Sequence, residues 1–219
     1  MHNDTTAVPV VTIDGPSGSG KGTVSQLLAK RLGWHYLDSG SVYRVLALML
    51  RKREVELSDI SAIVTTAKTL DAKIAHQIIS AQVDIRSEEC GTIASKIATI
   101  PAVRSALLTF LHTFSKLPGL IADGRDMGTV VFPHAQLKVF LTASIAARAK
   151  RRLLQLQSGG INATLSVVLQ GLRERDMRDE KRAIAPLKPD PTAVIIDTTK
   201  LNIDEVLQVV LDHVHNMAF

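Results

Sequence analysis

Short apolar runs alternate along the chain with longer segments in which apolar residues recur every three to four positions. The short runs predict buried strands at 10–13, 34–37, 120–123, 137–141 and 193–197. The longer segments predict helices at 21–32, 39–52, 59–70, 87–100, 101–116, 144–156, 165–181 and 203–217. Because strands alternate with helices, we predict an α/β fold with a parallel sheet of about five strands, flanked by helices.

Local signals refine this prediction at a few positions. Gly33 follows the first predicted helix in the usual C-terminal position, and Pro101 begins a later one. Residues 72–86 have a more extended character and predict a small hairpin, whereas Gly159 and Gly160 break the chain between two helices. On the first helix, one face is expected to pack on the sheet. The residues expected on that face are Val24, Leu27, Leu28 and Leu32.

Composition narrows the class of protein. The 219 residues are 46% hydrophobic and 21% charged, as in globular proteins, and we expect a single domain over 1–219. The single cysteine, Cys90, can form no intramolecular disulfide, which fits a reducing compartment. The uncharged stretch 153–172 is too polar to span a bilayer, and the first residues lack a signal-peptide pattern. We therefore expect a soluble, cytoplasmic protein.

Net charge is +5 and the isoelectric point is near 9.5, which suits an anionic partner. Between Arg148 and Arg182 there are nine Lys or Arg residues against four Asp or Glu residues. A local cluster of this kind favours a compact anionic ligand over a long polyanion.

The most specific chemical signal joins the first predicted strand to the first predicted helix. Glycines in this loop let successive backbone N–H groups converge on phosphate oxygens at the helix N-terminus, and Lys21 can reach the β- and γ-phosphates. The usual pattern has a Mg²⁺-binding hydroxyl directly after the lysine, whereas here Gly22 intervenes before Thr23. The predicted triphosphate site consists of Gly15, Pro16, Ser17, Gly18, Ser19, Gly20, Lys21, Gly22 and Thr23.

A second group of residues could bind another anion. The Asn-Lys-x-Asp motif of guanine-specific proteins is absent, which argues against a GTPase. Ser39 and Arg44 flank a predicted helix start where a phosphate could bind, although a capped helix with a solvated arginine is the alternative. Asp123 ends the third predicted strand and could order Mg²⁺ and its waters. Beside it, Arg125 could hold phosphate and Asp126 could accept from a base amino group, with a tight turn as the alternative.

Two predicted helices carry arginines on common faces around the Gly159-Gly160 break. Phosphoryl transfer requires distributed positive charge and exclusion of water, which an arginine-bearing lid would supply on closing. The residues that share these faces are Arg148, Arg151 and Arg152 on one helix, and Arg175, Arg178, Asp179 and Arg182 on the other.

The chain resembles the bacterial cytidylate kinases, a family of phosphate-binding-loop nucleoside monophosphate kinases, over nearly its whole length. The resemblance is carried by 14–23, 37–44, 121–133, 174–182 and 185–187. The strings Gly-Arg-Asp-Met-Gly-Thr and Arg-Asp-x-x-Asp-x-x-Arg are its most specific parts. The resemblance implies a nucleotide-kinase fold with an insertion that binds the monophosphate and a short lid. It divides the chain into a core at 8–38, 117–148 and 183–219, a monophosphate-binding region at about 39–116, and a lid at about 149–182.

The resemblance also implies an activity, which is transfer of the γ-phosphoryl group of ATP to CMP or dCMP with Mg²⁺, by a monomer that binds neither nucleic acid nor membrane. It implies catalytic roles for Lys21, Arg125, Arg175 and Arg182, and contacts to ATP from the loop, Arg151 and Arg152. The implied CMP contacts are Ser39, Arg44, Ser95, Arg104, Arg125, Asp126, Arg175, Asp179 and Arg182. Thr23 and Asp123 are the implied metal residues, directly or through water.

Two segments depart from the family pattern. The segment 71–86 is shorter than the usual insertion, and the lid tip, 158–171, lacks the usual charges. Two other functions remain as alternatives. One is a different small-molecule kinase on the same core, such as one for shikimate or dephospho-coenzyme A. The other is a basic nucleic-acid-binding protein, although the chain has no aromatic stacking platform for it.

Overall fold

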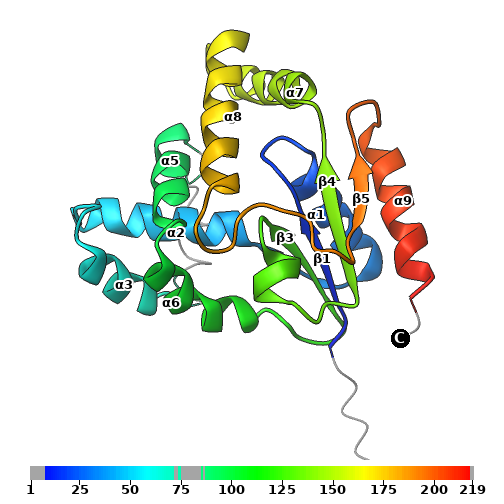
Figure 1. Ribbon diagram of the computed structural model, residues 1–219, viewed down its shortest axis with the longest axis horizontal. Helices are drawn as coiled ribbons and strands as arrows, with labels where there is room; N and C mark the ends of the chain where they lie inside the picture. The colour runs from blue at the N-terminus through cyan, green and yellow to red at the C-terminus, as the bar shows by residue number, and fades with distance from the viewer. Residues whose placement is uncertain (1–7, 72–73, 75–84, 86, 218–219) are drawn as a thin grey trace, which may run out of the picture.

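Five parallel strands form one sheet in the order β2-β3-β1-β4-β5 (Figure 1). The computed structural model describes residues 8–71, 74, 85 and 87–217. The strands are β1 (Val10–Asp14), β2 (His35–Asp38), β3 (Leu120–Gly124), β4 (Leu137–Thr142) and β5 (Val194–Asp197). All five predicted strands are present, and the predicted fold class is confirmed.

Helices cover both faces of the sheet. On one face, α1 (Lys21–Leu32) and α9 (Ile203–His215) bury side chains such as Ile13, Leu28 and Val210. On the other face, a larger apolar cluster joins the sheet to four helices and a π-helical turn. These elements are α2 (Ser39–Lys52), α3 (Ile60–Lys68), α5 (Glu88–Ile97), α6 (Pro101–His112) and η1 (Met127–Val131). The core is therefore built mainly from aliphatic residues, as the low aromatic content implies.

Two further helices, α7 (Ile145–Ser158) and α8 (Leu165–Glu180), lie beyond the carboxyl ends of the strands (Figure 1). They pack against each other through a small cluster of their own that includes Leu156 and Leu172. α8 also contacts α5, which belongs to the helices on the α2 face of the sheet. A cavity is lined by residues of α8, of α5 and of the strand ends.

Most helix starts follow from capping residues. The side chains of Asp38, Ser144 and Thr164 accept hydrogen bonds from backbone N–H groups of α2, α7 and α8, respectively. Asn202 and Glu205 form a reciprocal capping box at α9. Gly33 ends α1 with a φ of 68°, in the left-handed region that glycine tolerates best.

Several sequence expectations differ from the structure. Leu27 is 37% exposed, although it was expected on the buried face of α1. Small residues explain the difference, because Ser25 and Ala29 let α1 approach the sheet on their side, and Leu27 lies about 100° around the helix from Leu28. α6 ends at His112 rather than at 116, and the turn η1 was not predicted at all. The predicted hairpin at 72–86 lies almost entirely outside the described residues.

No single helix in the described part of the chain is both long and apolar enough to cross a membrane. Among the described helices, α5 and α6 pass that test of length and composition when taken together, and they are bent by 103° at the break between them.

The packing of α1 predicts a contrast between two adjacent leucines. Leu28→Ala should lower the free energy of unfolding by about 2–5 kcal/mol, because it leaves a cavity beneath the sheet. Leu27→Ala is the matched control and should cost less than about 1 kcal/mol, since this side chain already meets solvent. Urea denaturation of the two variants measures both values. Equal losses would contradict the orientation of α1.

Candidate functional site

The loop between β1 and α1 places backbone N–H groups at the helix N-terminus. Gly15 has a φ of 152°, and a Cβ atom there would lie 2.1 Å from the carbonyl oxygen of Leu141, so only glycine fits. α1 begins after Gly20, which has no side chain to cap the first N–H groups. The helix therefore presents uncapped donors and the positive end of its dipole to the loop, as an anion site requires.

Lys21 is buried at the start of this helix, and its Nζ atom donates to the carbonyl oxygen of Pro16 at 3.3 Å. Burial, followed by repulsion from Arg125, lowers the pKa of Lys21 to about 7. A desolvated lysine of this kind is only half-protonated near neutral pH, and an anion beside it would restore its charge.

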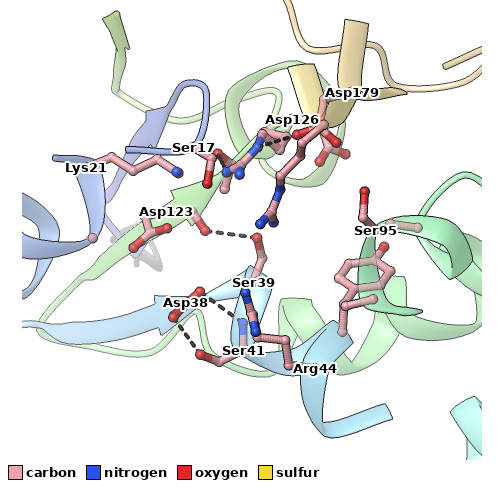
Figure 2. A pocket seen from close by; sticks show the side chains of 18 of the residues that line it. Ser17, Lys21, Asp38, Ser39, Ser41, Arg44, Ser95, Asp123, Asp126 and Asp179 are labelled. Atoms are coloured by element: carbon pink, nitrogen blue, oxygen red, sulfur yellow. Dashed lines mark hydrogen bonds and ion pairs between the residues drawn. The ribbon is translucent and has the colours of Figure 1, made fainter. Parts of the chain in front are cut away.

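A cavity opens beside this loop, at the carboxyl ends of β1, β2 and β3 (Figure 2). The nine residues expected to bind the monophosphate all line it, together with Ser17, Lys21, Gly22, Asp123 and Arg152. Figure 2 shows Lys21 and Asp123 on one side of the cavity and Ser95 on the opposite side. Loop, turn and helix residues up to 165 positions apart in the sequence thus meet in one place, as Ser17 and Arg182 illustrate.

Asp179 on α8 organises the arginines of this cavity. Its carboxylate accepts from the Nε atom of Arg125 at 2.8 Å and also pairs with Arg182. Burial would raise the pKa of Asp179, but the guanidinium groups of Arg125 and Arg182 hold it below its ordinary value. One buried carboxylate therefore fixes two cations from different elements.

Three polar side chains form a second group on the α5–α6 side of the cavity. Asp126 pairs with Arg104, whose other nitrogen donates to the carbonyl oxygen of Ala98 at 3.2 Å. The nearby Ser95 Oγ is buried and has no hydrogen-bond partner within the described structure. Burial raises the pKa of Asp126 against the lowering effect of Arg104. A ligand placed here would meet a carboxylate, a guanidinium and a hydroxyl with hydrogen-bonding capacity to spare.

Two further arginines, Arg44 and Arg175, add positive charge to the same cavity. Two backbone carbonyls, those of Ile85 and Ser87, hold the Arg44 guanidinium at 2.9 and 3.1 Å. Arg175 is partly buried, its buried Nε atom has no partner among the described residues, and desolvation followed by repulsion from Arg125 lowers its pKa to about 10. The cavity thus contains cations that the neighbouring carboxylates do not fully neutralise, and it is suited to a compact anion.

The carboxylate of Asp123 fits Mg²⁺ bound mainly through water and phosphate. It accepts a hydrogen bond from the hydroxyl of Tyr36 at 2.6 Å, and no ion pair to it occurs among the described residues. Burial, followed by repulsion from Asp38, raises its pKa to about 6, which a nearby cation would reverse. Within the described ranges no three His, Cys, Asp or Glu side chains cluster as a metal cage. Mg²⁺ commonly uses one or two carboxylates together with substrate phosphates and waters.

The structure does not bring all predicted residues into the same cavity. Thr23 is exposed and lines a second cavity on the other side of the loop, apart from Asp123. Arg151 also lies in this second cavity, where its guanidinium donates to Thr198 Oγ1 at 3.0 Å and to the carbonyl of Thr198. Arg152 faces the first cavity and pairs with Glu88. The walls of the second cavity are Gly18, Ser19, Gly20, Thr23, Val24, Arg151, Leu154, Gln155, Thr198, Leu201, Asn202, Ile203 and Val206.

Arg148, which was grouped with the other lid arginines, is buried and does not line either cavity. It makes two hydrogen bonds to Asp176, at 2.7 and 3.0 Å, and one to the carbonyl oxygen of Ser17 at 3.2 Å. It therefore joins α7, α8 and the phosphate-binding loop as a structural residue, because its guanidinium is used by the protein itself.

Sequence reasoning missed other residues that shape the site. Tyr43 lines the first cavity and is four positions after Ser39 on α2, so helical periodicity could have identified it. The contact between Tyr36 and Asp123 depends on the pairing of β2 with β3, which no local pattern reports. Asp14, at the end of β1, binds the backbone of η1, an element that was not predicted.

The arginine pair on Asp179 leads to a stability prediction. Asp179→Asn should lower the free energy of unfolding by about 3–5 kcal/mol, because it leaves two buried guanidinium groups without a counter-charge. Asp212→Asn, at an exposed position on α9, is the control and should change little. Thermal unfolding measures both variants.

The same substitution predicts a pH dependence. The pKa of Asp179 lies below its ordinary value of 3.8 in the folded protein, so its stabilising contribution is present above that pH. That contribution is lost as the pH falls through the folded-state pKa. The difference in stability between wild type and Asp179→Asn should therefore shrink in acid; a constant difference down to acid denaturation would contradict the pairing.

Comparison with known proteins identifies the family. The family model for cytidylate kinase matches residues 11–216. A cytidylate kinase from Aeromonas hydrophila subsp. hydrophila is 53% identical over 214 residues, which cover 93% of this chain and 92% of that relative. A cytidylate kinase from Shewanella sediminis is 50% identical over 217 residues, covering 94% of each chain.

Among solved structures, an uncharacterized protein from Eubacterium ventriosum matches with a TM-score of 0.52 and 12% identity, over 95% of this chain and 99% of the other. At that identity the match shows the fold alone. The sequence matches extend over the loop, the turn after β3 and the arginine-bearing helix α8, all of which line the cavity described above. The chain belongs to the cytidylate kinase family and is a nucleotide phosphotransferase.

Proposed function

We propose that the protein transfers the γ-phosphoryl group of ATP to CMP or dCMP, giving ADP and CDP or dCDP. The observation that carries this proposal is the position of the Ser95, Arg104 and Asp126 group beside the arginine cluster and opposite Lys21. A base-reading group, a phosphate-binding group and a triphosphate loop then follow one another across a single cavity.

The base-reading group has the polarity that cytosine requires. The carboxylate of Asp126 can only accept when ionised, and it would bind the exocyclic amino group of cytosine. The guanidinium of Arg104 can only donate and would bind a ring acceptor, and the unpartnered hydroxyl of Ser95 is free to bind the base as well. Uracil presents an oxygen where cytosine has its amino group, so UMP would place an acceptor against Asp126.

The acceptor phosphate is assigned to the arginine cluster. Ser39, Arg44, Arg125, Arg175 and Arg182 surround the space between the base-reading group and Lys21, and Asp179 orients two of them. An oxygen of the CMP phosphate attacks the γ-phosphorus of ATP, a new P–O bond forms, and the bond to the β,γ-bridging oxygen breaks. No strong base is required, since the attacking oxygen is already anionic.

The donor triphosphate is assigned to the loop 15–23, with Lys21 and the uncapped start of α1 facing its phosphates. The second cavity lies on the other side of this loop, and its mixture of apolar side chains with Arg151 suits the donor nucleoside. Arg152 lines the first cavity and is assigned to the donor phosphates. To bind them, it would have to break its ion pair with Glu88. Bound Mg²⁺ would neutralise the developing charge on the phosphates, and Asp123 and Thr23 are the residues assigned to its surroundings.

We assign the parts of the chain to these roles. The core comprises 8–38, 117–148 and 183–219, the monophosphate-binding region 39–116 and the lid 149–182. An ion pair between Arg152 on α7 and Glu88 on α5 links the assigned lid to the monophosphate-binding region. The acidic and basic groups of the cavity suit small nucleotides rather than nucleic acid or a membrane, and we propose a cytoplasmic monomer.

A coupled assay with ATP and each nucleoside monophosphate tests the function. CMP and dCMP should be phosphorylated with the highest kcat/KM, because cytosine offers an amino group to Asp126 and a ring acceptor to Arg104. Preference for AMP or GMP would refute the proposal. Shikimate and dephospho-coenzyme A serve as further acceptors that would reveal another small-molecule kinase.

The role of Asp126 is tested by two substitutions. Asp126→Ala should lower kcat/KM for CMP by about a hundredfold, as expected for loss of a charged hydrogen bond, while the KM for ATP changes less than about threefold. Asp126→Asn adds an amide donor and should shift the ratio of UMP to CMP turnover towards UMP. If either variant weakens the use of ATP, measured by its KM, as much as it lowers kcat/KM for CMP, base reading by Asp126 is excluded.

Lys21 predicts proton uptake on nucleotide binding. Its pKa in the free protein is about 7 against an ordinary value of 10.5, and the triphosphate should raise it by supplying negative charge. At a pH between these two values, ATP binding should therefore take up protons. Calorimetry in buffers of different ionisation enthalpy measures the number, and Lys21→Met should abolish it. Uptake that persists in this variant would assign the proton to another group.

A further inference from the structure

Asp14 is a buried carboxylate that the proposed chemistry does not use. It is the last residue of β1, directly before the phosphate-binding loop, and only 5% of its surface is exposed. One oxygen accepts from the backbone N–H of Met127 at 2.9 Å, and the other accepts from the N–H of Gly128 at 2.8 Å. These are the first two residues of η1, so Asp14 caps that turn from a neighbouring strand.

Capping by Asp14 replaces the residue that normally has this role. Asp126 occupies the N-cap position of η1, but its side chain makes no capping hydrogen bond and pairs with Arg104 in the cavity instead. An aspartate at an N-cap ordinarily binds the N–H groups of the following turn. Because Asp14 satisfies those donors, the carboxylate of Asp126 is free to face the cavity.

The same contact fixes both ends of the turn that carries Arg125 and Asp126. At one end, Asp14 and Gly124 are register partners in the pairing of β1 with β3. At the other end, Gly128 lies so close to β1 that a Cβ atom there would be 2.7 Å from Thr12 Oγ1. The three residues between Gly124 and Gly128 therefore connect two anchored points, and a small shift of either anchor would move the side chains of Arg125 and Asp126.

Asp14 lies in a buried position that disfavours its ionised form. Burial raises the pKa of Asp14 to about 7 despite the two amide donors, and the charged groups that act on it are Asp126 and Arg125. An apolar residue would remove the buried charge but would leave two buried N–H groups without acceptors. This balance is consistent with a role in placing neighbouring groups.

We propose that Asp14 is a positioning residue that sets acceptor specificity by holding Asp126 in its base-reading position. The inference rests on the proposed function, in which Asp126 reads cytosine. Asp14 also connects the donor loop to the turn that reads the acceptor, because it directly precedes Gly15 and its carboxylate binds η1. A purely structural Asp14 would lower the stability of the protein without changing the choice between CMP and UMP.

The test is a double-mutant cycle on acceptor choice at pH 8, where Asp14 is mainly ionised. In Asp14→Asn, an amide group faces one of the two N–H donors, and the ratio of kcat/KM for CMP to that for UMP should fall about ten- to a hundredfold. The KM for ATP should change less than about threefold. In the Asp126→Ala background, Asp14→Asn should have no further effect on the ratio. Asp59→Ala, which removes an exposed cap on α3, is the control and should leave the ratio unchanged.

Three results would overturn the inference. The first is an unchanged CMP-to-UMP ratio of kcat/KM in Asp14→Asn, and the second is a rise in the KM for ATP as large as the fall in that ratio. The third is a further fall in the ratio when Asp14→Asn is added to Asp126→Ala. Asp14→Ser, with a single acceptor oxygen and the same readout, replaces Asp14→Asn if that variant does not fold. The wild type separates the two proposals. If it shows no preference for CMP, the proposed function fails; if it prefers CMP while the Asp14 variants keep its ratio, only the positioning role fails.

Discussion

Buried positive charge is the constraint on which the site depends. Lys21 is buried, Arg125, Arg175 and Arg182 are partly buried, and all four face one cavity. Removing such groups from water is costly, and the cost is acceptable only where carboxylates or a bound anion compensate it. Asp179 compensates two of the arginines, whereas Lys21 and Arg175 have lowered pKa values because burial and neighbouring cations act on them. The cavity therefore has an excess of positive charge, which favours binding of an anion.

Strand order explains how this charge is assembled. β1 lies at the centre of the sheet, so the phosphate-binding loop has the turn after β3 on one side and the end of β4 on the other. Ligands of open α/β sheets bind at the carboxyl ends of the strands for this reason. The loop also separates the two cavities, since Ser17 and Lys21 line one and Ser19 and Thr23 line the other. A donor bound along the loop would thus meet the acceptor on one side only.

The sequence predicts the scaffold well because its signals are local. Apolar runs, capping residues and glycines identify the five strands, most helix starts and the loop at 15–23. The nine residues expected to bind the monophosphate were also predicted, because the motifs carried by each segment resemble those of a known family, whereas Tyr43 was missed. Where sequence reasoning failed, the missing information concerned packing. Arg151 and Arg152 are adjacent and share a charge, yet they face different cavities because successive helical residues point about 100° apart.

Contacts between segments that are distant in the sequence could not be predicted from local sequence patterns. Leu27 is exposed because small residues set how α1 approaches the sheet, and Tyr36 meets Asp123 because β2 pairs with β3. Asp14 is the extreme case, since its partners are the N–H groups of a π-helical turn that periodicity does not predict. A backbone donor leaves no mark in the sequence, so a side chain that acts through one is found only from the folded structure. Residues of this kind can fix the orientation of the motif residues that contact a substrate. The motif alone is therefore not enough to predict which substrate is preferred.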